Sequence, residues 1–197
     1  DNQIDWGNNT LDNPGDRKVI GNTTPRFSFG LNANVQYRAF DLTLFFQGVG
    51  KREAAPSPTS HVSNFFWGIT GDLGQSSGFV QQHDRWTEAT PDGYYPRYYL
   101  TTAEMNKNKQ TQTRYLLNAS YLRVKNLQLG YNLPTAIAKR FCQKLRLFIN
   151  LENLLTVTKY IKTMDPEFSN TQGYALGPDG KVYPLQRVWA GGLQVTF

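Results

Sequence analysis

Five segments of the chain alternate between apolar and polar residues, the pattern of strands that turn one face toward an apolar environment. In the clearest segment, 27–37, every odd-numbered residue is apolar and every even-numbered residue is polar or small. Its length matches the ~9–11 residues that a tilted strand needs to cross a bilayer, whereas strands in soluble proteins usually have about 5–6. We therefore predict membrane-spanning strands at 27–37, 40–49, 120–132, 144–154 and 187–197.

The alternation changes phase in the third of these segments, near Lys125 and Asn126. Leu122 and Val124 are even-numbered, whereas the apolar residues from Leu127 onward are odd-numbered. A β-bulge produces such a shift, and so does a strand that continues beyond the membrane. The pattern leaves both explanations open.

The connections between the segments alternate in length. The connections 38–39 and 133–143 are short, and the second contains a predicted helical turn at 135–141 with Thr135 as its N-cap. The segments 1–26, 50–119 and 155–186 are long. Outer-membrane barrels have short periplasmic turns and long external loops, so we expect all three long segments to be extracellular. Five strands cannot close a barrel without leaving unpaired edges in lipid, and we expect the other strands elsewhere in a longer protein.

Composition agrees with a barrel. The chain of 197 residues is 39% hydrophobic and has no run of about 18 apolar residues, so it contains no transmembrane helix. Its net charge of +6 is scattered through the expected loops instead of following one helix or stripe, which argues against a nucleic-acid-binding protein. Solvated loops are the favoured explanation of this charge, with attraction to anionic lipid head groups or acidic ligands as the alternative. The single Cys142 excludes an internal disulfide.

No catalytic or metal-binding motif is present, so we expect no enzyme, no cofactor and no metal. The only histidines, His61 and His83, lie far apart in one expected loop. The motif Asp165-Pro166-Glu167 offers oxygen ligands of the kind that calcium prefers. Two carboxylates are too few for such a site, and a turn with surface acids is the favoured reading.

Two groups of residues are candidates for binding. Aromatic side chains provide broad contact surfaces at low entropy cost, and the loop 50–119 is rich in them; packing of the loop or contact with a partner is favoured over contact with a ligand. The three polar residues on one face of 144–154 are expected to face the lumen. Contact with a plug and simple hydration are equally good explanations of their polarity. The aromatic candidates are Phe65, Phe66, Trp67, Trp86, Tyr94, Tyr95, Tyr98 and Tyr99, and the lumen candidates are Arg146, Asn150 and Glu152.

Several short motifs resemble, in the right order, the last part of SusC/RagA-type TonB-dependent transporters. The most specific match is Ser120 to Pro134, with the sequence SYLRVKNLQLGYNLP. It is preceded by DRKVIGN at 16–22, FSFG at 27–30 and DRWT at 84–87, and followed by ENLL at 152–155, DPE at 165–167 and GLQVTF at 192–197. The resemblance covers nearly the whole chain.

The resemblance implies an all-β fold, the C-terminal strands of a transmembrane antiparallel barrel of the 22-strand class with long extracellular loops. It implies a Gram-negative outer-membrane importer of oligosaccharides or peptides, with a SusD-like surface lipoprotein as lid and a dimer of transporter–lid pairs as an expected assembly. TonB would act through a plug that this chain lacks. The alternatives are a passive porin-like or other outer-membrane barrel and a soluble carbohydrate-binding β-sandwich.

Overall fold

The computed structural model describes residues 5, 7–8, 10–55, 83–97, 110–160, 165–168 and 185–197. Their main element is one antiparallel sheet of five strands, and there is very little helix. The expected all-β antiparallel fold is confirmed. No helix in this described part is long and apolar enough to span a membrane.

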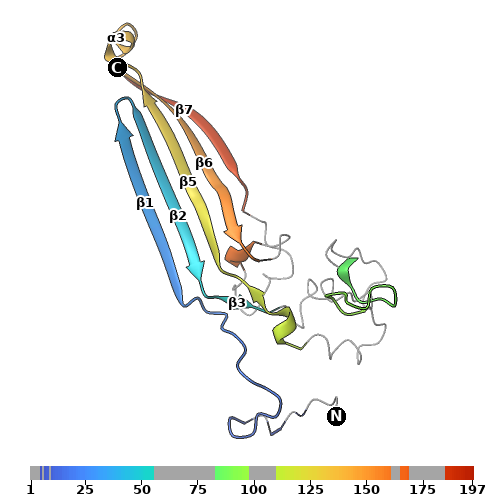
Figure 1. Cartoon of the computed structure of the whole chain (residues 1–197). Helices are drawn as coiled ribbons and strands as arrows, with labels where there is room; N and C mark the ends of the chain where they lie inside the picture. The colour runs from blue at the N-terminus through green and yellow to red at the C-terminus, as the bar shows by residue number, and fades with distance from the viewer. Residues whose placement is uncertain are drawn as a thin grey trace.

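The sheet is a meander in the order β1-β2-β5-β6-β7 (Figure 1). Each strand pairs antiparallel with its neighbours in this order. The strands occupy the five alternating segments of the sequence, and the fourth continues to Thr158, beyond its expected end at 154. Their bounds are β1 Phe27–Tyr37, β2 Phe40–Gly50, β5 Tyr121–Asn132, β6 Lys144–Thr158 and β7 Val188–Thr196.

The expected helical turn is α3, Thr135–Ala138, but its N-cap is Pro134 and not Thr135. Proline has a fixed φ that suits the start of a helix, so the turn begins one residue earlier than the side-chain cap rule indicates. The remaining short elements are β3 Glu53–Ala54, paired with β4 Leu117–Asn118, and the 3-10 turns η2 Thr113–Tyr115 and η3 Pro166–Phe168.

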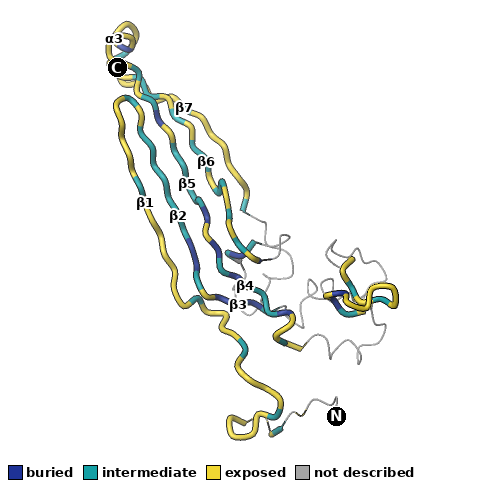
Figure 2. Tube along the Cα trace, viewed as in Figure 1, coloured by how far each residue is buried: buried dark blue, intermediate teal, exposed yellow. Residues whose placement is uncertain are grey.

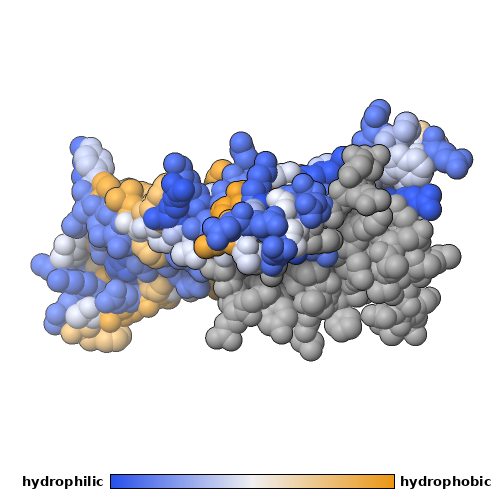
Figure 3. All heavy atoms as spheres, turned by 90° about the horizontal axis from the view of Figure 1, so that it is seen from below, coloured by the Kyte–Doolittle hydropathy of each residue, from blue (hydrophilic) through white to orange (hydrophobic). Residues whose placement is uncertain are grey.

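The strand register gathers apolar side chains on one face of the sheet, which we call the apolar face. Directly paired residues of antiparallel strands share a face, and Leu31 pairs with Phe46, which pairs with Val124, which pairs with Leu155. Leu31 is 58% exposed and Leu155 is 52% exposed, so this face is uncovered. The opposite, polar face carries Asn32 and the residues in register with it. Figure 3 shows hydrophobic residues at the surface among hydrophilic ones.

A bulge keeps the apolar residues of β5 on the apolar face. Val124 and Asn126 pair with Phe46 and Phe45, which are adjacent in β2, so Lys125 is an extra residue in β5. Of the two explanations that the sequence left open for the change of phase, the structure shows the bulge. It also restores the phase, because the apolar residues before and after it lie on the same side of the sheet.

The short and long connections leave from opposite ends of the sheet (Figure 1). The turns 38–39 and 133–143 lie at one end, called here the short-turn end. The long segments leave from the other, the long-loop end. Buried residues concentrate at the long-loop end (Figure 2), where Ala54, Ala119 and Tyr160 pack together. The strands themselves are largely exposed, so tight packing occurs where the loops meet the sheet.

Candidate functional site

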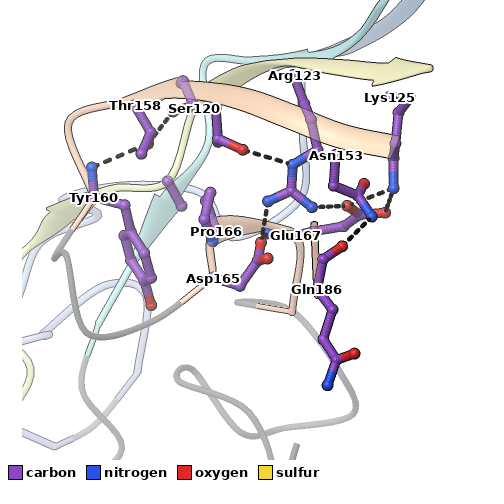
Figure 4. A network of polar contacts seen from close by, with 12 residues as sticks. Ser120, Arg123, Lys125, Asn153, Thr158, Tyr160, Asp165, Pro166, Glu167 and Gln186 are labelled. Carbon is purple, nitrogen blue, oxygen red and sulfur yellow. Dashed lines mark hydrogen bonds and ion pairs between the residues drawn. The ribbon is translucent and has the colours of Figure 1, made fainter. Parts of the chain in front are cut away.

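Arg123 is the centre of a polar cluster at the long-loop end of the polar face (Figure 4). It is 2% exposed. Its Nε donates to Thr156 Oγ1 of β6 at 2.8 Å. Its two terminal nitrogens form ion pairs with Asp165 at 2.6 Å and with Glu167 at 2.7 Å. A buried guanidinium is costly unless it is paired and hydrogen-bonded, and here every nitrogen has a partner.

The β5 bulge places Lys125 against the same acidic turn. Its Nζ lies 2.9 Å from both carboxylate oxygens of Glu167. The backbone amide of Glu167 also donates to Asp165 Oδ1 at 2.9 Å, which closes the turn on itself. The motif 165–167 therefore attaches the connection between β6 and β7 to the sheet.

This pairing removes the support for a calcium site at the acidic turn. Asp165 and Glu167 already bind two cationic side chains. The described residues contain no group of three or more side chains that would hold a metal ion. The turn is an attachment point, and its acids are partly buried instead of lying free at the surface.

Arg52, in the link between β2 and β3, extends the cluster. It is buried and donates to the backbone carbonyls of Ala119, at 3.2 Å, and of Pro166. Desolvation lowers the pKa of Arg52 below the ordinary arginine value, and burial raises the pKa of the neighbouring Tyr160. Arg52 thus joins three connections that are distant in sequence.

Residues 83–97 and 110–115 form a small unit built on tyrosines, called here the tyrosine unit. The rings of Tyr94 and Tyr115 pack edge to face with centroids 5.4 Å apart. Arg114 donates to the carbonyls of Tyr94 at 3.1 Å and of Gly93 at 3.0 Å. Both tyrosine hydroxyls donate to backbone carbonyls of the unit. Burial raises the pKa of Tyr95 and Tyr115.

Three of the eight aromatic candidates lie in the tyrosine unit. Tyr95 is 8% exposed and belongs to its interior, whereas Trp86 and Tyr94 are each 36% exposed. Trp86 lines a groove of about 520 Å³ together with Pro91, Gly93, Tyr95, Pro96, Arg97, Gln112, Arg114 and Tyr115. The candidates Phe65, Phe66, Trp67, Tyr98 and Tyr99 lie outside the described residues.

The lumen candidate Arg146 is held within the sheet itself. It forms a two-point ion pair with Asp41 of β2, with N–O distances of 2.5 and 3.1 Å. The pair crosses β5 directly over Gly130, where a Cβ would lie 2.4 Å from the nearest Asp41 oxygen. A glycine at this position therefore leaves space for the ion pair.

The other two lumen candidates, Asn150 and Glu152, also lie on the polar face of β6. Asn150 accepts from Asn126 of β5 at 3.0 Å and donates to Glu152 at 3.3 Å. Glu152 forms no ion pair in the described part of the chain, whereas Arg146 is held by Asp41 at two points. The structure brings Asn150 and Glu152 into contact and places Arg146 apart with Asp41.

No family model matches the chain, but comparison with known proteins finds several that are similar to it. TonB-dependent receptor P3 of Formosa agariphila is 32% identical over 192 residues, which are 92% of this chain and 17% of the relative. TonB-dependent receptor P26 of the same organism is 27% identical over 92% of this chain and 18% of the relative. The chain thus spans less than a fifth of the length of these relatives.

The similarity to transporters of this kind extends to the fold. The structure of the RagAB peptide transporter matches with a TM-score of 0.65 and 27% identity, over 91% of this chain and 18% of that chain. The chain is related to the SusC/RagA-type TonB-dependent receptors. The structure of the RagAB peptide importer in its open-open state matches with a TM-score of 0.63 and 25% identity, again over 91% of this chain and 18% of that chain. The names of these relatives describe receptors and transporters.

Sequence reasoning missed Arg123, Lys125 and Arg52 as site residues. The sequence did contain a signal for Arg123. It is an arginine among the polar positions of a long alternating strand, where a charged partner is expected. The partner was not predictable, since Asp165 lies 42 residues away in sequence. Arg114 and Tyr115 were missed because nothing in the sequence links them to Tyr94.

Proposed function

We propose that the chain forms part of the wall of a large outer-membrane β-barrel that imports oligosaccharides or peptides. In this proposal it is the C-terminal portion of a 22-strand-class barrel, with a SusD-like lipoprotein as lid. TonB supplies energy through a plug elsewhere in the parent protein. The relationship to TonB-dependent receptors and to the RagAB peptide transporter supports the proposal, and makes oligopeptides the first substrates to assay.

The observation that carries this proposal is the uncovered apolar face. In water, apolar surface costs roughly 25 cal/mol per Å², and a soluble sandwich would cover the face with a second sheet. The other sheet in the described residues consists only of β3 and β4, each two residues long. Lipid is the environment in which such a face is stable, which favours a barrel wall over a sandwich.

The strand edges favour a larger barrel. β1 and β7 are the outermost strands of the described sheet, so each has one edge that pairs with no other strand of that sheet. An unsatisfied backbone group in hydrocarbon costs several kcal/mol. Further strands of the parent protein would pair with both edges, and the long-loop end would then be extracellular.

Uptake by cells that make the full-length parent protein tests active import. We expect a deletion strain to regain uptake of labelled oligopeptides or oligosaccharides when the gene is restored. A protonophore should abolish this uptake, because TonB-dependent import requires the proton gradient. Uptake that continues unchanged in the protonophore would instead establish a passive porin-like barrel.

Trp86 is the described aromatic residue best placed to contact a substrate or the lid, because it is exposed and lines the groove. Trp86→Ala should lower uptake or co-purification of the lid lipoprotein, while Trp86→Phe, which keeps an aromatic ring, should retain most of both. Barrel abundance in the membrane is the control. Unchanged uptake and lid binding in Trp86→Ala would show that the groove only packs the loop.

A further inference from the structure

The short-turn end carries several cations that have no acidic partner. In the described part of the chain, the ion pairs involve only Arg123, Lys125 and Arg146 as cations. The one acidic side chain among the described residues at this end, Asp41, already pairs with Arg146. Within the described residues, the cations at this end that form no ion pair are Arg38, Lys139, Arg140 and Lys144.

Exposed aromatic residues lie beside two of these cations. Phe141 is 80% exposed and Phe197 is 86% exposed. Both line a hollow of about 600 Å³ together with Lys139 and Arg140, and with Cys142 and Gln143. The hollow therefore combines positive charge with large apolar side chains, although most of its lining belongs to one short turn.

The hollow is continuous with the apolar face. Leu193 pairs with Leu147 and Val195 pairs with Leu145, both on the apolar parity of β6. Phe197 follows at the next position of the same parity. Aromatic and basic residues at the end of an apolar wall are the side chains that occupy the head-group region of a bilayer, where long cationic side chains reach toward phosphates.

We propose that this rim, formed by Lys139, Arg140, Phe141 and Phe197, binds the head group of an acidic phospholipid. The proposal rests on the membrane wall proposed above. Lys139 and Arg140 would bind the lipid phosphate, and the two phenylalanines would lie at the boundary with the acyl chains. A lipid fits better than a protein partner because the rim continues into a face that is itself proposed to contact lipid.

Native mass spectrometry of the delipidated full-length parent protein in detergent tests this inference. Phosphatidylglycerol or phosphatidylcholine is added back, and bound lipid is counted. Each basic residue near an anionic surface contributes about 1 kcal/mol, so Lys139→Gln with Arg140→Gln should weaken phosphatidylglycerol binding by roughly tenfold or more. Phosphatidylcholine binding should change little. The exchange Lys139→Arg with Arg140→Lys should retain phosphatidylglycerol binding.

The matched control is Lys159→Gln with Arg187→Gln, which removes two exposed cations at the long-loop end. It should leave phosphatidylglycerol binding unchanged. An equal loss in this control, or an equal loss of phosphatidylcholine in the rim variant, would overturn the inference. Displacement of the lipid by inorganic phosphate alone would also overturn it, by showing a small-anion site. Uptake is measured separately, so active import with no preference for phosphatidylglycerol would reject only the rim.

Discussion

The two ends of the sheet use positive charge in opposite ways. At the long-loop end, Arg52 and Arg123 are buried and bind acids or carbonyls of connections distant in sequence. At the short-turn end, Lys139 and Arg140 are exposed and form no ion pair within the described residues. The net charge of +6 therefore includes two groups of cations with different surroundings. One part holds loops against the sheet, and another part is available to an external partner.

Burial explains why the two groups should respond differently to substitution. A buried charge that loses its partner keeps the full cost of desolvation, whereas an exposed charge is screened by water and salt. Substitutions of the buried, paired arginines at the long-loop end should therefore affect folding, and those of the exposed cations Lys139 and Arg140 at the short-turn end should affect binding.

The largest expected effect is at Arg123. Arg123→Met leaves Asp165 and Glu167 without their shared partner and should lower the free energy of unfolding of the parent barrel by about 3 kcal/mol. Urea denaturation in lipid vesicles measures this change. Arg187→Met, at an exposed position, is the control and should stay within about 0.5 kcal/mol of the unchanged protein. A loss at Arg123 no larger than that of the control would mean that the cluster does not anchor the loop.

A smaller effect is expected at Gly130, beneath the ion pair at the short-turn end. A Cβ there would lie within 2.5 Å of both Asp41 and Arg146 and would displace their pair. This half-buried pair contributes on the order of 1 kcal/mol, and Gly130→Ala should cost about that much in the same denaturation experiment. Gly191→Ala is the control, because the nearest atom to its added Cβ is 3.9 Å away. Equal costs at both glycines would contradict the role of the ion pair.

The smallest effect is expected at Lys125, which lies at the solvent-accessible edge of the buried cluster. Lys125→Gln should cost no more than about 0.5 kcal/mol, because Glu167 keeps its ion pair with Arg123, and the cost should fall at high salt. A double-mutant cycle with Glu167→Gln measures the coupling. Coupling as large as that between Arg123 and Asp165 would show that Lys125 is as important to the anchor as the buried arginine.

The sheet could be predicted from the sequence because its determinant is local. A strand with one apolar face must alternate with period two. The apolar side of 27–37 can therefore be identified from its own sequence, even if the neighbouring strands are unknown. The change of phase near Lys125 was also visible in the sequence, with a bulge as one of its two explanations. The N-cap of α3 was wrong because the backbone preference of Pro134 outweighed the side-chain capping of Thr135.

The candidate site was less predictable because its determinants are not local. Aromatic composition identified Trp86 and Tyr95 together, yet packing buries Tyr95 and leaves Trp86 exposed. The carboxylates of 165–167 looked like surface acids, because nothing in the sequence shows that they meet Arg123. Arg146 looked free to bind a plug, but its partner Asp41 is two strands away in the sheet.

The most direct test of the account is whether the apolar face contacts lipid, because the proposed barrel wall and the proposed lipid-binding rim both depend on that contact. Leu31 lies on the apolar face and its neighbour Asn32 on the polar face. Leu31→Arg should destabilise the parent barrel in lipid vesicles by about 2–4 kcal/mol, the cost of a basic residue on the lipid side near the bilayer centre. Asn32→Arg should cost much less, since residue 32 lies on the opposite, polar face. Equal losses of folding free energy in the two variants would contradict the account.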